Sequence, residues 1–169
     1  MGLMSFMKEA GEKLFGRKET EAAAQAVQTA PDPAAAQAQL DALNATAAQA
    51  IRNYIDTQKL SVGGLMVEFD GATSSVTVSG EAPDQATKEK VLLCCGNVDG
   101  VAQVNDLMTV AAPADESSWH TVVRGDTLSK IAKEAYGNAN DYMKIFEANK
   151  PMLSHPDKIY PGQVLRIPA

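Results

Sequence analysis

The chain has 169 residues, which is enough for one ordinary domain or two small ones. Its 15 Lys and Arg residues against 21 Asp and Glu residues give a net charge of −6, which argues against a nucleic-acid binder and against attachment to anionic membranes through overall charge. Aromatic residues make up only 5% of the chain, so few rings are available for base stacking. The sequence has no run of 18 apolar residues, and no transmembrane segment is therefore expected.

The charge is distributed unevenly. Residues 1–118 hold 8 Lys and Arg against 16 Asp and Glu, whereas residues 119–169 hold 7 against 5. This change of sign predicts two separately folded modules with a weak mutual attraction.

Residues 1–16 are expected to form an amphipathic helix. Charged residues interrupt every apolar run in this segment, so it does not read as a secretory signal, and the protein is expected to stay in the cytoplasm. The apolar residues recur instead at helical spacing, at Leu3, Phe6, Met7, Ala10 and Leu14. We expect this stripe to dock on the protein's own domains in preference to a partner or a membrane surface.

Residues 17–39 are rich in Ala and Gln and predict a linker. Part of it, Glu21–Thr29, is expected to be helical, and the pair Pro31 and Pro33 breaks that helix. A helix then re-forms and becomes amphipathic at Leu40, Leu43, Ala47, Ile51, Tyr54 and Ile55.

Residues 40–112 predict a small module with the order α-β-β-α-β. The helix is followed by two alternating segments around Asp70-Gly71, which indicate a β-hairpin, then by a helix from Ala86 to Cys95 and a last strand. The motifs V-x-V-x-G at 76–80 and G-N-V-D-G-V-x-x-V at 96–104 resemble the BON domain. The resemblance implies a binding module without catalytic residues.

Cys94 and Cys95 are adjacent and cannot build a disulfide framework. Neighbours on a helix point about 100° apart, so one thiol can be buried while the other is partly exposed. A zinc site would need further ligands, and the two histidines, His120 and His155, are far away in sequence. We therefore expect packing residues, with redox or metal roles as the alternatives.

Residues 118–169 predict a second module with the order βααβ, after a short linker at 113–117. The stretch H-T-V-x-x-G-D-T-L-S-x-I-A at 120–132, with I-F-E-A-N and I-Y-P-G-Q-V-L-R-I-P further on, resembles the LysM domain. In this reading Asp126 is the N-cap of the first helix. LysM domains bind glycans that contain N-acetylglucosamine, such as peptidoglycan, in a shallow groove, which the resemblance would line with Gly125, Asp126, Thr127, Leu128, Asn149 and Ile159.

The two modules together, behind the start M-G-L-x-x-F-x-K-x-A-G-E-K-L, resemble the small cytoplasmic potassium-binding BON–LysM proteins of Gram-negative bacteria. The resemblance implies an α+β protein that binds K⁺ as a sensor or buffer and becomes more compact on binding. The Ala/Gln-rich segment departs from that family as a longer insertion. A monomer is expected.

A potassium site has no side-chain signature, because selective sites surround this large ion with neutral carbonyl oxygens. Paired carboxylates, which favour divalent ions, are not spaced for such a site in this sequence. The best candidate is the loop after the second helix of the BON-like module, where unpaired helix carbonyls carry partial negative charge and two glycines let the chain curl. From geometry alone, an ordinary helix-to-strand turn is the favoured alternative, and the family resemblance favours the ion site. The predicted ligands are the carbonyls of Gly96, Val98 and Val101, with Met7 and Ala10 from the N-terminal helix that the resemblance adds.

Two other classes of function are the alternatives. A cell-wall glycan-binding protein would use the LysM groove but would need export. An enzyme is not expected, because residues 1–118 contain no histidine and no G-x-S-x-G motif.

Overall fold

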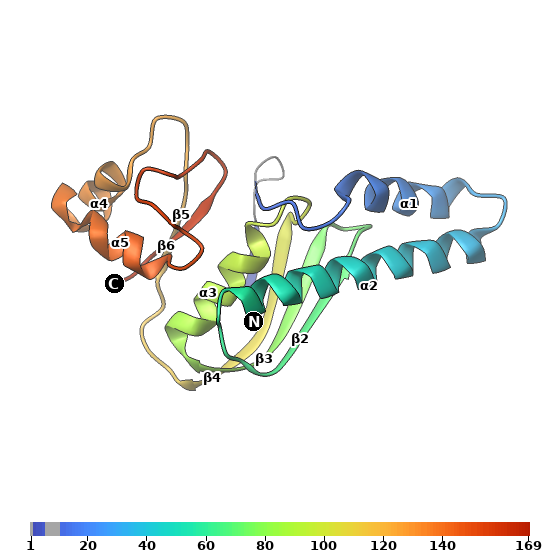
Figure 1. Ribbon diagram of the computed structural model, residues 1–169, viewed down its shortest axis with the longest axis horizontal. Coiled ribbons are helices and arrows are strands. Elements are labelled where there is room, and N and C mark those ends of the chain that lie inside the picture. The colour runs from blue at the N-terminus through green and yellow to red at the C-terminus, as the bar shows by residue number, and fades with distance from the viewer. Residues whose placement is uncertain (1, 6–10) are drawn as a thin grey trace.

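Two units of mixed helix and sheet follow one another in the computed structural model, which describes residues 2–5 and 11–169 (Figure 1). The first unit contains β1 (Gly2–Ser5), α1 (Arg17–Thr29), α2 (Pro33–Thr57), β2 (Gly63–Asp70), β3 (Ser75–Asp84), α3 (Gln85–Gly96) and β4 (Gln103–Ala112). The second contains β5 (Ser118–Thr121), α4 (Leu128–Tyr136), a 3₁₀ turn at Ala139–Asp141, α5 (Tyr142–Ala148) and β6 (Val164–Ile167). The expected α+β class and the orders α-β-β-α-β and βααβ are confirmed.

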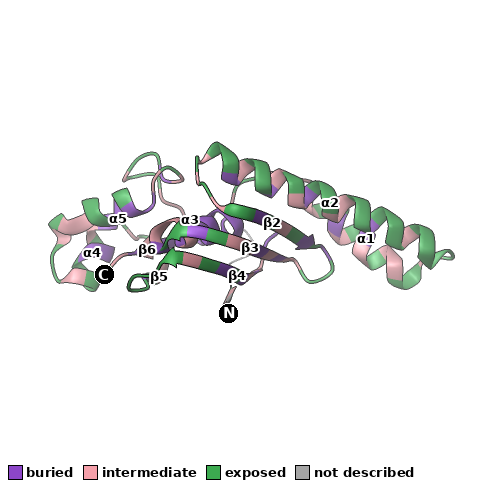
Figure 2. Ribbon diagram, turned by 90° about the horizontal axis from the view of Figure 1, so that it is seen from below, coloured by how far each residue is buried: buried purple, intermediate pink, exposed green. Residues whose placement is uncertain are grey.

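The first unit is built on a four-stranded sheet in the order β1-β4-β3-β2. β2 and β3 form the predicted hairpin, and β3 runs parallel to β4, with α3 as the crossover that a parallel pair requires. Inward and outward residues alternate along these strands, as Figure 2 shows, with Val76 and Val78 fully buried. Helices α2 and α3 pack on the buried face.

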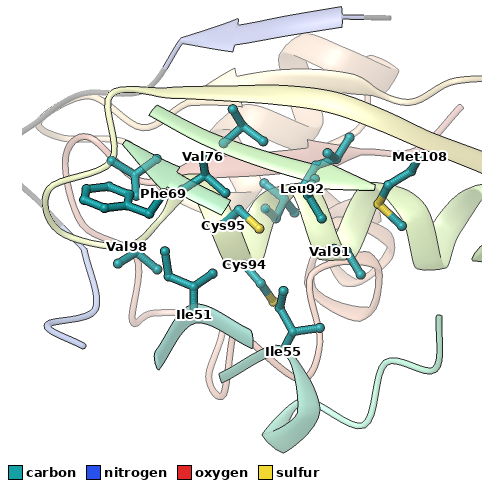
Figure 3. Packing of buried hydrophobic residues seen from close by; sticks show 14 of the residues in the cluster. Ile51, Ile55, Phe69, Val76, Val91, Leu92, Cys94, Cys95, Val98 and Met108 are labelled. Atoms are coloured by element: carbon teal, nitrogen blue, oxygen red, sulfur yellow. The ribbon is translucent and has the colours of Figure 1, made fainter. Parts of the chain in front are cut away.

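The core of this unit lies between the sheet and those two helices (Figure 3). Ile51 and Ile55 of α2 face Val91 and both cysteines of α3 across it. Cys94 and Cys95 are free thiols, and burial raises the pKa of Cys94 to about 12 and that of Cys95 further. The prediction that they are packing residues is confirmed, and both are buried, not one of the two.

The expected N-terminal helix is wrong for the residues that the structure describes. Gly2–Ser5 form β1, which pairs antiparallel with the edge of β4, and residues 11–16 are not helical. An open strand edge offers unpaired N–H and C=O groups, and pairing with it outweighs a weak helical periodicity. The predicted ligands Met7 and Ala10 lie outside the described residues.

The segment expected to be a linker is a helical hairpin. Helix α1 begins at Arg17, the chain turns at Pro31, and Asp32 caps α2 by accepting hydrogen bonds from two backbone N–H groups. Thr20 and Ala23 of α1 are buried, as is Leu40 of α2, so the alanines allow two helices to pack closely. Figure 1 shows the hairpin projecting away from the second unit.

The second unit has a hydrophobic cluster of its own around Ile131, Ile145 and Leu165. Its two strands pair antiparallel, and α4 ends at Gly137 in the left-handed region with φ +76°. The expected N-cap is wrong by one residue: Thr127 caps α4, while the Asp126 carboxylate accepts the Val123 N–H and pairs with His120 Nε2 at 2.8 Å. In the described part of the chain, no helix is both long enough and apolar enough to span a bilayer.

Candidate functional site

The candidate ion loop, residues 96–101, follows the C-terminus of α3. Asn97 caps the helix through its N–H to the Leu93 carbonyl at 2.9 Å, and the Val101 N–H closes a turn onto the Val98 carbonyl at 3.1 Å. Gly100 has φ +97°, a conformation that favours glycine, whereas Gly96 remains within the helix and is not among the residues with positive φ. The loop therefore begins at the negative end of a helix dipole.

An N-terminal segment lies directly along this loop. The Glu12 N–H donates to the Asn97 carbonyl at 2.9 Å, and the Asp99 N–H donates to the Glu12 carbonyl at 2.9 Å. Together they form a parallel bridge between Glu12 and Val98. The approach requires Gly11, because a Cβ there would stand 2.3 Å from the Asn97 carbonyl oxygen.

Three of the predicted carbonyl ligands lie in this one loop. Gly96, Val98 and Val101 are all buried. The Val98 oxygen accepts one hydrogen bond and keeps a second lone pair. Among residues 2–5 and 11–169, no turn or loop N–H donates to the carbonyl of Gly96 or Val101. The loop thus offers neutral oxygen atoms of the kind that K⁺ prefers.

The second unit contacts the same loop through Asn97. Its side-chain Nδ2 donates to the Val164 carbonyl at 3.0 Å, and its Oδ1 accepts the Val164 N–H at 2.9 Å. The side chain is 4% exposed and also lies 3.5 Å from the Met152 sulfur. Sequence reasoning missed this residue, because an asparagine that ends a helix is common and carries no signal of a distant partner.

A buried ion pair joins the two units nearby. Glu89 of α3 pairs with Arg166 of β6, and it also accepts the Ser117 N–H and the Gln85 amide, each at 2.9 Å. Burial acts to raise the pKa of Glu89, but Arg166 and the other donors outweigh it and hold that pKa below its usual value. The pair agrees with the opposite net charges of the two halves.

The Glu12 carboxylate influences the pKa of one tyrosine in each unit. Burial, with a smaller contribution from the Glu12 carboxylate, raises the pKa of Tyr54 on α2 and of Tyr160 in the second unit. Through the hydrogen bonds of Glu12 and Asn97, the candidate loop lies where the N-terminal segment and the two units meet.

Comparisons with known proteins give the same two units. A BON domain model matches residues 44–112 and a LysM domain model matches residues 120–168. Over 99% of both chains, the sequence is 46% identical to the potassium binding protein Kbp of Escherichia coli O6:H1. The chain belongs to the Kbp family. An uncharacterized protein of Deinococcus radiodurans is 40% identical over 75 residues, which are 43% of this chain and 29% of that relative.

The predicted glycan groove of the LysM domain is only partly available. Gly125 and Thr127 are exposed, Ile159 is half-buried, and Leu128 is buried in the domain core. Asn149 is 1% exposed, and its amide is engaged with the backbone of Ile145 and Arg166. The Asn149 side chain is therefore a structural link between α5 and β6, and glycan binding in this groove stays a prediction.

Two partly buried carboxylates are paired with cations. Lys88 binds Asp106 at 2.8 Å, and Arg17 lies 3.2 Å from Asp99. Within residues 2–5 and 11–169, no group of three or more His, Cys, Asp or Glu side chains is placed to hold a metal ion.

Proposed function

We propose that this member of the Kbp family binds K⁺ through backbone carbonyl oxygens and serves as a cytoplasmic sensor or buffer without catalysis. The single observation that carries the proposal is the 46% identity, over 99% of both chains, to a protein named for potassium binding. The proposed ligands are the carbonyls of Gly96, Val98 and Val101, with Met7 and Ala10 from the N-terminal segment.

The chemistry of the loop supports this choice of ion. K⁺ is weakly hydrated, and neutral carbonyl dipoles can replace its water shell. The buried loop at 96–101 offers such carbonyls at a helix C-terminus, where partial negative charge favours a cation. The segment around Glu12 is bridged to this loop at Val98, and the proposed ligands Met7 and Ala10 directly precede that segment in the sequence.

The contacts of Asn97 support a change of shape on binding. A ligand shifts a conformational equilibrium only through its different affinity for the two states. An ion held by the loop and the N-terminal segment would favour the state in which both are ordered. That state is also the one in which Asn97 reaches Val164 of the LysM domain. We expect the K⁺-bound protein to be the more compact form.

The test is a calorimetric titration of the dialysed full chain with KCl and with NaCl, together with thermal melts at matched ionic strength. A ligand at one hundred times its Kd stabilises the folded state by about 2.7 kcal/mol. For a chain of this size, that corresponds to a rise in Tm of about 5–10 °C. Small-angle scattering of the same samples measures compaction.

Equal melting temperatures in the two salts, with no heat on adding KCl, would refute K⁺ binding. A K⁺ response without any change in radius of gyration would refute the compaction alone.

A further inference from the structure

Arg17 lies against the ion loop. Its Nη1 donates to the Asp99 carboxylate at 3.2 Å, while its Nε donates to Glu21 at 2.9 Å. Gly100 makes room for this side chain: a Cβ on that glycine would stand 3.3 Å from the Arg17 Cγ. The loop thus contacts both the aliphatic stem and the guanidinium of Arg17, at the first turn of α1.

Asp99 is the one carboxylate within the loop itself. Carbonyl oxygens alone suit K⁺, but carbonyls joined by a carboxylate form the ligand set that Ca²⁺ prefers. Whether the loop discriminates against divalent ions therefore depends on what occupies Asp99. Its side chain is 22% exposed and the Arg17 side chain 28%, so the pair is partly shielded from water.

We propose that Arg17 is a specificity-determining residue, which neutralises Asp99 and so keeps the carboxylate from ligating a divalent cation in the K⁺ loop. The inference rests on the proposed K⁺ binding. Arg17 acts in two ways: it occupies the Asp99 oxygen, and its charge repels a divalent ion twice as strongly as a monovalent one.

This scaling with ion charge gives a quantitative expectation. If the loss of the Arg17 charge tightens K⁺ binding by about three-fold, the same potential tightens Ca²⁺ binding by the square of that factor, about nine-fold. Coordination by the freed carboxylate adds to the Ca²⁺ term alone. The ratio of Ca²⁺ to K⁺ affinity should therefore rise by at least three-fold in Arg17→Gln.

The experiment titrates KCl and CaCl₂ separately into the full chain and three variants. Arg17→Gln keeps the Cβ and Cγ that lie over Gly100 but removes the charge. Lys18→Gln, at the exposed neighbour on α1, makes the same change in net charge and should leave the ratio as in wild type. In Arg17→Gln with Asp99→Asn, the ratio should return toward the wild-type value.

An unchanged ratio in Arg17→Gln, an equal rise in Lys18→Gln, or a rise that persists in the double variant would each overturn the inference. Wild-type protein that does not bind K⁺ would instead refute the proposed function, so the two failures are distinct. Thermal melts show whether Arg17→Gln folds. If it does not, Arg17→Met takes its place, because methionine retains an apolar stem over Gly100, and the same change in the ratio of affinities is expected.

Discussion

Replacing Gly11 with alanine tests whether the N-terminal segment forms part of the ion site. The new Cβ would lie 2.3 Å from the Asn97 carbonyl oxygen and 2.8 Å from the Asp99 nitrogen, and real Cβ atoms essentially never come within 3.0 Å of such atoms. Both neighbours are backbone atoms, so no side-chain rotation relieves the collision. The segment must move away from the loop.

The magnitude follows from the contacts that this movement breaks. The two hydrogen bonds between Glu12 and the loop, to Asn97 and from Asp99, contribute about 1 kcal/mol each. If K⁺ binding requires the segment in place, the loss of about 2 kcal/mol weakens K⁺ binding by about 30-fold. The segment is followed at Arg17 by α1, which packs on α2.

Calorimetry with KCl measures the effect, and Gly125→Ala is the matched control. Gly125 also has a positive φ, +92°, but an added Cβ there meets no atom within 4 Å. The control therefore introduces backbone strain without a collision and should keep wild-type K⁺ affinity. A Gly11→Ala protein that binds K⁺ as tightly as wild type would show that the segment's position along the loop does not matter for the ion.

Three further predictions concern the loop and the junction. Gly100→Val forces a β-branched residue to φ +97° and should weaken K⁺ binding by about 5- to 30-fold, equivalent to about 1–2 kcal/mol. Calorimetry of Asp99→Asn should instead show a change of less than about three-fold. The reverse order would mean that a carboxylate holds the ion. Asn97→Leu leaves the Val164 N–H and C=O without their amide partner, which should lower the free energy of unfolding by about 1–3 kcal/mol. Hydrogen exchange at the Val164 amide should become faster. Unchanged exchange would contradict the proposed link between the domains. Because the pKa of Glu89 is lowered in the folded state, the ionised carboxylate contributes stability above about pH 4.3, and this stability is lost as the pH falls through the folded-state pKa. Glu89→Gln should therefore unfold more readily at pH 7. Denaturant titrations at a series of pH values should show a flatter loss of stability on the acid side for this variant.

The fold of both modules could be predicted because their patterns are local. The hairpin at 63–84 has period-two alternation around a turn, and α4 has apolar residues at helical spacing up to a C-terminal glycine. The prediction was wrong for the N-terminal strand, because its structure depends on a partner that is distant in the sequence. Nothing in residues 2–5 indicates β4, more than ninety residues away, as the edge that they join.

The prediction of a linker at residues 17–39 missed the helical hairpin for a different reason. Alanine buries little surface, so an alanine-rich segment predicts a spacer. Two alanine-rich helices can nevertheless approach closely, and a few larger or polar residues, such as Leu40 and Thr20, then suffice to fix the hairpin. The proline break was visible in the sequence, but the packing of the two halves was not.

The candidate loop was predicted from the family resemblance together with its two glycines, and only one of these glycines has the conformation that lets a chain curl. Gly100 has φ +97°, whereas Gly96 stays helical. The glycine with the tightest contact is Gly11, which was not singled out, because its role depends on a loop that lies far along the chain.

The contacts of Asn97 suggest how the proposed backbone-carbonyl site would be coupled to the rest of the protein. Its N–H caps α3 at Leu93, its carbonyl accepts the Glu12 N–H, and its side chain holds the backbone of Val164. One residue therefore connects the helix, the N-terminal segment and the LysM domain, each through a different group. If the loop binds K⁺ as proposed, drawing the neighbouring carbonyls toward the ion would turn the peptide units on either side of Asn97, and all three connections would be affected together. Coupling of this kind needs no charged ligand, which is why the residues that carry it look ordinary in the sequence.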